Sequence, residues 1–159
     1  MKSLKNTIKY IFFDVDGTLT DGSIYMSSDG ELFKRFNIKD GYAIKNILPK
    51  YGIVPVFITS RYSKIVQKRA VELGVKFVFQ GVKNKESAIV DFLKKQKSNP
   101  SLAAYVGDDI PDGKAMLKCA FRACPSDAIF EIKMTSNYVS KCKGGYGAVR
   151  DIIEYIINH

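Results

Sequence analysis

Apolar residues in this chain follow two alternating patterns. Some runs are almost continuously apolar, which is typical of parallel strands covered on both faces. They comprise residues 8–13, 54–58, 77–79 and 102–106. Helical spacing of apolar positions separates these runs, over residues 42–50, 63–73 and 85–95. Gly74 follows the second of these helices as a stop signal. The alternation predicts an α/β fold with a doubly wound parallel sheet.

One segment breaks this alternation directly after the first predicted strand. Residues 23–26 and 31–36 are short strand-like runs, and the Asp29-Gly30 pair between them is a strong hairpin signal. We therefore predict a β-hairpin flap over about residues 21–37. An isolated hairpin is only marginally stable in water, so the flap is expected to pack against another subunit or, alternatively, its own domain. Its apolar side chains are Ile24, Tyr25, Leu32, Phe33 and Phe36.

Length and composition predict one soluble domain. The chain has 159 residues and is 46% hydrophobic, which suffices for one core spanning residues 1–159 and is too little for two ordinary domains. No stretch approaches the roughly 18 uninterrupted apolar residues of a membrane-spanning helix. The first residues do not resemble a signal peptide, so we expect a cytoplasmic protein without a membrane partner. The three cysteines form no zinc-binding pattern.

Charge narrows the class of partner. The net charge is +9, from 25 Lys and Arg against 16 Asp and Glu, so the surface should attract anions. Phosphate esters and nucleic acids both qualify. The lysines are spread along the chain rather than gathered in one basic stretch, so we expect no nucleic-acid partner.

The end of the first predicted strand carries the candidate chemistry. The strand runs into Asp14-Val15-Asp16-Gly17-Thr18, which places two carboxylates on either side of one residue. A carboxylate can attack phosphorus and form an aspartyl phosphate, and a second carboxylate nearby can move the proton. Taken alone, the same residues could form an ordinary turn at the end of a strand.

Residues 14–18 resemble the DxDx(T/V) motif with which phosphatases of the haloacid dehalogenase superfamily begin. Three further segments match that superfamily in the correct order. Thr59 ends the second predicted strand, Lys85 follows the third, and an acidic segment beginning at Asp108 follows the fourth. Such an ordered set is far more specific than a lone DxD.

The resemblance implies a role for each matched residue. Asp14 would be the nucleophile and Asp16 the general acid and base. The cofactor would be Mg²⁺, bound by Asp14, the backbone carbonyl of Asp16 and Asp108, since this cation prefers oxygen ligands. Lys85 and the Thr59 hydroxyl would stabilise the phosphoryl oxygens.

Several of these assignments have alternatives. Thr59 could be a buried β-branched strand residue, and Lys83 competes with Lys85 for the role of the phosphate-binding lysine. Asp109 and Asp112 are expected to orient the metal ligands or Lys85. The alternative for Asp112 is the cap of a helix that starts near Gly113.

Superfamily members often carry a cap domain, and this chain has room only for the hairpin. It therefore resembles the capless class, in which a neighbouring subunit closes the site. Within that class it resembles the family of 3-deoxy-D-manno-octulosonate 8-phosphate phosphatases, tetrameric enzymes of lipopolysaccharide precursor synthesis. The segments that carry this resemblance are residues 21–22, 33–36, 40–42, 80–81 and 144–150, together with Arg61 and Arg69.

The substrate so implied is a sugar acid with a phosphate at one end and a carboxylate at the other. Arg61 and Arg69 are expected to bind it, because guanidinium groups pair well with such anions. Surface solvation or a structural ion pair is the alternative for both arginines. The related phosphatases of nine-carbon sialic-acid-type 9-phosphates typically have glutamate in place of Arg61. Ser60 replaces the usual glycine and could narrow the phosphate loop.

Three functional alternatives remain open. The first is a phosphatase for nine-carbon sialic-acid-type 9-phosphates, including a domain associated with acylneuraminate cytidylyltransferase. The second is a catalytically idle assembly or regulatory module. The third is an anion-binding or nucleic-acid-binding protein. The resemblance favours a homotetramer whose flap covers a neighbouring subunit's site. The glycine-rich segment 144–147 would either start a helix or reach that neighbour.

Overall fold

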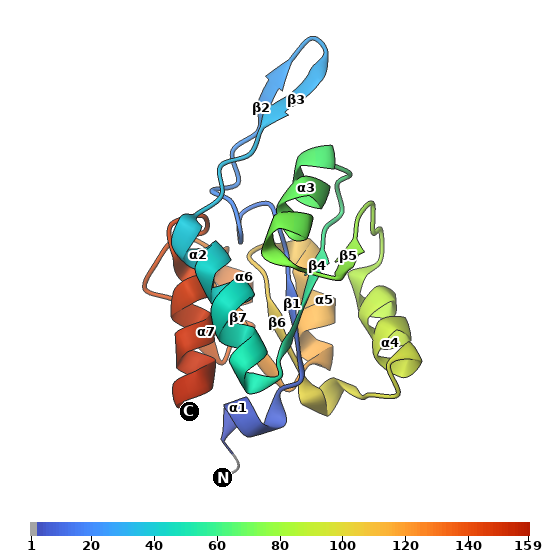
Figure 1. Cartoon of the computed structure of the whole chain (residues 1–159), viewed down its shortest axis with the longest axis vertical. Helices are drawn as coiled ribbons and strands as arrows, with labels where there is room; N and C mark the ends of the chain where they lie inside the picture. Colours follow the sequence, from blue (N-terminus) through green and yellow to red (C-terminus); the bar gives the residue numbers. More distant parts are fainter. Residues whose placement is uncertain (1–2) are drawn as a thin grey trace.

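The structure, a computed structural model that describes residues 3–159, contains a six-stranded parallel sheet with helices on both faces (Figure 1). The strand order is β5-β4-β1-β6-β7-β8. The strands are β1 Tyr10–Phe13, β4 Val54–Ile58, β5 Phe77–Phe79, β6 Ala103–Val106, β7 Phe121–Cys124 and β8 Tyr138–Val139. This arrangement confirms the predicted doubly wound α/β fold.

Helices cover both faces of this sheet. They are α1 Leu4–Thr7, α2 Ile38–Tyr42, α3 Lys64–Leu73, α4 Lys85–Lys95, α5 Ile110–Lys118, α6 Phe130–Thr135 and α7 Ala148–Asn158. A π-helical turn, Ala43–Ile47, and a 3-10 turn, Leu48–Tyr51, continue α2, and another 3-10 turn spans Pro100–Leu102. None of the helices within residues 3–159 is long and apolar enough to cross a membrane.

Alternate residues of β1 contribute to two separate cores. Ile11 and Phe13 pack on the side covered by α3 and α7. Phe12 faces the opposite side, where α4 and α5 supply apolar residues. All three side chains are completely buried. Burial on both faces explains why the strands read as continuous apolar runs rather than as alternating ones.

Several element boundaries differ from the prediction. The helix expected over residues 42–50 begins earlier, at Ile38, because the Asn37 side chain accepts a hydrogen bond of 2.8 Å from Lys39 N and caps it. The helix expected near Gly113 begins at Ile110 instead. Strands β7 and β8 were not predicted, because β7 is short and interrupted by Arg122.

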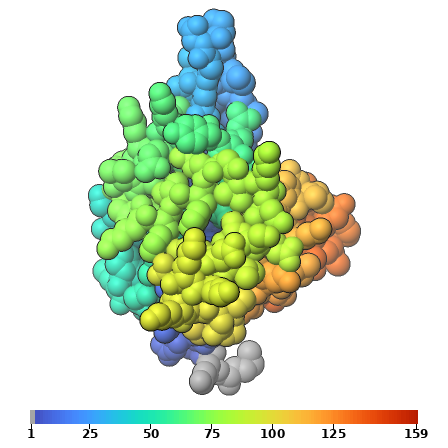
Figure 2. Space-filling view, turned by 90° about the vertical axis from the view of Figure 1, so that its right-hand side faces the viewer, coloured from blue at the N-terminus to red at the C-terminus, as the bar shows by residue number. Residues whose placement is uncertain are grey.

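The predicted hairpin flap is present as β2 Tyr25–Ser27 and β3 Gly30–Phe33. Its base is closed by a bridge between Thr20 and Phe36, and the rings of Tyr25 and Phe33 stack with their centroids 4.2 Å apart. Figure 2 shows the hairpin as a narrow projection beyond the rest of the surface. It rises at the end of the molecule toward which β1 runs (Figure 1).

Candidate active site

The predicted site residues meet at the carboxyl ends of the central strands. Asp14 follows β1, Thr59 follows β4 and Asp108 lies shortly after β6. These strands are neighbours in the parallel sheet, so their ends open into one place. A cavity of about 200 Å³ lies there, lined by Asp14, Asp16, Thr59, Ser60, Arg61, Lys85, Asp109, Pro111 and Asp112.

A buried lysine connects two of the carboxylates. Lys85 is the first residue of α4, whose start Asn84 caps by accepting from Ser87 N at 3.0 Å. The Lys85 Nζ lies 2.5 Å from Asp14 Oδ1 and 2.7 Å from Asp112 Oδ1. Lys83 is exposed, so the structure places Lys85 rather than Lys83 beside Asp14.

Burial and neighbouring charge shift the pKa values of this pair. Burial, reinforced by the charge of Asp112, raises the pKa of Asp14 well above its ordinary value, and Lys85 offsets only part of that effect. Burial alone lowers the pKa of Lys85, but Asp14 and Asp112 outweigh it and leave this pKa raised. Lys85 is therefore a cation held between two carboxyl groups.

Asp112 is a structural acceptor at the start of α5. Its Oδ1 accepts from Lys85 Nζ and from the Tyr105 hydroxyl at 2.8 Å, and its Oδ2 accepts from the backbone N–H groups of Asp108 and Asp109 at 3.1 and 3.3 Å. These donors occupy the lone pairs of the carboxylate. Asp109 caps α5 and Asp112 is its third residue, so the alternative that Asp112 is the cap is wrong.

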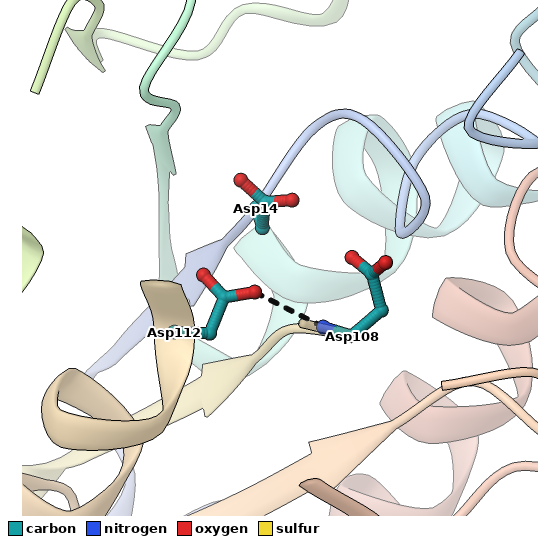
Figure 3. Close-up of side chains that lie close together, drawn as sticks. All are labelled: Asp14, Asp108 and Asp112. Atoms are coloured by element: carbon teal, nitrogen blue, oxygen red, sulfur yellow. Dashed lines mark hydrogen bonds between the residues drawn. The ribbon is translucent and has the colours of Figure 1, made fainter. Parts of the chain in front are cut away.

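Three carboxylates lie close together, and Lys85 forms hydrogen bonds with only two of them, Asp14 and Asp112. Oxygens of Asp14, Asp108 and Asp112 lie within 4.8 Å of one another (Figure 3). Burial and the nearby Asp112 raise the pKa of Asp108 to about 7. Thr18 donates to Asp108 Oδ1 at 2.9 Å, and a Cβ on Gly17 would collide with the same carboxylate.

This cluster fits a hard divalent cation. The donors are all oxygens, and like charges in a buried place repel one another unless a cation joins them. Because the lone pairs of Asp112 are already used, Asp14 and Asp108 are the side chains best able to act as ligands.

Asp16 lies at the cavity with cations on both sides. Lys34, which follows β3 of the hairpin, forms an ion pair with Asp16 Oδ1. Arg61 Nε lies 3.9 Å from Asp16 Oδ2. Burial lowers the pKa of Lys34, but its hydrogen bonds to Asp16 and Glu31 outweigh this and raise the pKa. Lys34 belongs to residues 33–36, which carry the family resemblance, but no sequence pattern indicates its contact with Asp16, because that contact depends on how the hairpin folds back.

The loop after β4 supplies polar groups to the same cavity. The buried Thr59 accepts a hydrogen bond of 3.2 Å at its Oγ1 from the backbone N–H of Arg61. Ser60 and the Arg61 side chain are exposed toward solvent. Both residues therefore line the mouth of the cavity.

Arg69 lies elsewhere. Its guanidinium donates to Glu72 Oε2 at 2.9 Å and to Asn37 O at 3.4 Å. It borders a separate depression of about 460 Å³, whose lining also includes Lys34 and Lys68. Arg69 is thus not among the residues that the structure brings to the carboxylate cavity of its own chain.

The glycine-rich C-terminal segment packs on the first loop of its own chain. The backbone N–H of Gly145 donates to Thr18 O at 3.2 Å, and a Cβ on Gly144 would collide with Gly17 O. Gly147, at φ 102°, then starts α7. The segment therefore starts a helix, as one of the two alternatives predicted.

Known proteins resemble this chain over most of its length. The chain is 39% identical over 150 residues to the 3-deoxy-D-manno-octulosonate 8-phosphate phosphatase KdsC of Escherichia coli K12, covering 94% of this chain and 79% of the relative. No family model matches it.

Solved structures are also similar. The phosphatase of that name from Moraxella catarrhalis, in complex with magnesium, phosphate and KDO, superposes with a TM-score of 0.93 at 37% identity, covering 98% of this chain and 88% of the other. The cobalt-bound enzyme from Haemophilus influenzae gives a TM-score of 0.93 at 34% identity, covering 99% of this chain and 91% of the other.

Proposed function

Because this chain belongs to the 3-deoxy-D-manno-octulosonate (KDO) 8-phosphate phosphatase family of the haloacid dehalogenase superfamily, we propose that it hydrolyses KDO 8-phosphate. The observation that carries this proposal is the buried Lys85 bridge, which holds Asp14 in the cavity that Asp16 also lines. Such a constellation is suited to phosphoryl transfer onto an enzyme carboxylate. The reaction would serve lipopolysaccharide precursor synthesis.

We assign the two chemical steps to two carboxylates. Lys85 binds Asp14 Oδ1, and Asp14 Oδ2 attacks phosphorus while the bond from phosphorus to the sugar oxygen breaks. Asp16 gives its proton to that departing oxygen. In the second step Asp16 accepts a proton from water, which attacks the aspartyl phosphate and releases inorganic phosphate. Lys85 and the hydroxyl of Thr59 bind the phosphoryl oxygens in this proposal.

The cofactor of the proposed reaction is Mg²⁺, which Asp14, Asp108 and the backbone carbonyl of Asp16 would hold. When bound, it supplies positive charge that neutralises the phosphate and favours ionised carboxylates. Asp109 and Asp112 support the site from α5, because Asp109 caps the helix and Asp112 binds the backbone of Asp108.

The substrate preference follows from the cations at the mouth. Arg61 is in place to bind the sugar acid, and a glutamate there would repel a carboxylate. We expect faster hydrolysis of KDO 8-phosphate than of a nine-carbon sugar acid 9-phosphate. Phosphate release from both substrates, with Mg²⁺ and with excess chelator, tests this. Equal rates on both substrates, or turnover that the chelator does not reduce, would contradict the proposal.

We further propose that residues 1–159 form a single phosphatase domain that assembles into a cytoplasmic homotetramer. The free thiols of Cys119, Cys124 and Cys142 suit a reducing compartment.

In the assembly, the flap would cover a neighbouring subunit's cavity. Arg69 does not line the cavity of its own chain. If Arg69 binds substrate, it must therefore do so at the cavity of a neighbouring subunit, which the proposed assembly allows. Light scattering at several protein concentrations measures the assembly.

A further inference from the structure

The hairpin is tied to the active site of its own chain by one buried lysine. The side chain of Lys34 is only 3% exposed, although it directly follows the exposed strand β3. Its Nζ contacts Asp16 Oδ1 and lies 2.9 Å from Glu31 Oε1. Glu31 in turn accepts a hydrogen bond from Ser63 Oγ, and Ser63 caps α3. A chain of polar contacts thus runs from α3 through the hairpin to Asp16.

The two oxygens of Asp16 are in different environments. Lys34 occupies Oδ1, whereas Oδ2 is buried and accepts no hydrogen bond from any residue in the range 3–159. Arg61 Nε lies 3.9 Å from Oδ2, beyond hydrogen-bond length. Oδ2 is therefore the oxygen without a hydrogen-bond partner among these residues, and the Lys34 contact on Oδ1 fixes the rotation of the carboxyl group.

We propose that Lys34 is a positioning residue that holds Asp16 so that Oδ2 faces the departing sugar oxygen. This inference rests on the proposed phosphatase function. Lys34 does not touch the reacting atoms; it acts through the orientation of Asp16. Proton donation matters most when the leaving group is an alcohol, because an alkoxide is a poor leaving group. It matters little for p-nitrophenol, which leaves as a stable anion.

The test compares two substrates in the full-length chain with Mg²⁺. The quantity measured is kcat/KM for KDO 8-phosphate and for p-nitrophenyl phosphate, because kcat/KM reports the steps up to departure of the leaving group. Lys34→Met should lower kcat/KM for KDO 8-phosphate by about 100-fold, the usual cost of misplacing a catalytic group by an ångström. For p-nitrophenyl phosphate the loss should be less than about 3-fold, since little proton donation is required.

Three variants separate positioning from anchoring or from charge. Lys34→Arg keeps a hydrogen-bond donor, so its kcat/KM for KDO 8-phosphate should lie between the values of Lys34→Met and the wild type. Ser63→Ala removes the contact between α3 and Glu31 but leaves Lys34 paired with Asp16, so it should change kcat/KM for both substrates by the same factor. Lys39→Met removes an exposed positive charge on α2 and should leave the ratio of kcat/KM for KDO 8-phosphate to kcat/KM for p-nitrophenyl phosphate unchanged. In an Asp16→Ala background, Lys34→Met should have no further effect on the sugar substrate.

Equal losses on both substrates, or no loss on either, would overturn the inference. If circular dichroism shows that Lys34→Met is unfolded, the ratio of the two kcat/KM values is measured with Lys34→Gln, which removes the charge that contacts Asp16, and a ratio equal to that of the wild type overturns the inference equally. Failure of the proposed function has a different signature, because the wild-type chain would then not hydrolyse KDO 8-phosphate. The substrate ratio is in that case measured with any alkyl phosphate that the wild type hydrolyses.

Discussion

The carboxylate cluster at the end of β1 and the hairpin that follows it differ in how far their side chains are buried within a single chain. Asp14, Lys85 and Asp112 are buried, and Lys85 donates a hydrogen bond to each of the two carboxylates. In the hairpin, Met26 and Leu32 are 60% and 56% exposed. The centre for the chemistry is therefore built within the chain, while the apolar hairpin leaves surface that the described residues do not cover. Lys34 is the buried link between the two regions.

The largest expected effect is on the nucleophile. Asp14→Asn should reduce phosphate release by more than about 10⁴-fold, because the loss of a group that forms a covalent intermediate removes the pathway rather than slowing it. The amide keeps the shape of the carboxyl, so circular dichroism should be unchanged. Undiminished turnover of the purified variant would contradict the assignment of Asp14.

The next effect concerns the buried bridge. Lys85→Met should lower the free energy of unfolding by about 3–5 kcal/mol, because it leaves two buried carboxyl groups without their cation. Lys83→Met is the matched control, since Lys83 is exposed two residues earlier. It should change stability by less than about 0.5 kcal/mol. Urea unfolding measures both, and similar values for the two variants would contradict the structural role of Lys85.

Asp40, a buried carboxyl group outside the site, tests how much stability is lost when one carboxyl oxygen lacks a hydrogen-bond partner. Asp40 accepts from Arg150 N at 2.7 Å, but its Oδ2 has no hydrogen-bond partner within residues 3–159. Burial raises the pKa of Asp40 from an ordinary 3.8 to about 6, although backbone donors partly oppose this. A raised acid pKa means that the folded state holds the proton more tightly. Tighter proton binding by Asp40 therefore adds to the free energy of unfolding below pH 4, and this contribution is lost as the pH rises to 6.

The matching variant is Asp40→Asn, which keeps an oxygen to accept from Arg150 N and cannot ionise. Relative to wild type, its free energy of unfolding should rise by at most about 3 kcal/mol between pH 4 and pH 7, the equivalent of that difference in pKa. Urea unfolding of both proteins across this range measures the difference. A constant difference at all pH values would show that Asp40 does not titrate in that window.

The smallest expected effect on stability lies in the hairpin. Met26→Ser combined with Leu32→Ser should change the free energy of unfolding by less than about 0.5 kcal/mol per site, as expected of exposed positions. The same variant should shift the protein toward monomers in light scattering. Met134→Ser on α6, also exposed, is the control and should leave the assembly unchanged. A variant that assembles like the wild type would contradict the association role of the hairpin.

Prediction from the sequence succeeded where a local pattern decides the structure. The boundaries of β4, β5, α3 and α4 match their predicted ranges closely, because apolar runs, caps and the Gly74 stop all lie in neighbouring residues. The start of α2 was misplaced, since the Asn37 cap lies outside the apolar pattern. The last two strands are too short for the pattern to reveal them, since Arg122 interrupts the apolar residues of β7 and β8 has only two residues.

Apolar runs and the polar residues that follow them are enough to predict that Asp14, Thr59, Lys85 and Asp108 converge, because parallel strands bring their carboxyl ends to one edge of the sheet. The tertiary structure sets how these groups are paired. It gave Asp112 four donors, set Arg69 in a separate depression and brought Lys34 from the hairpin to Asp16. Such contacts depend on how loops fold back in space, and side-chain distances of a few ångströms are not encoded in any local spacing.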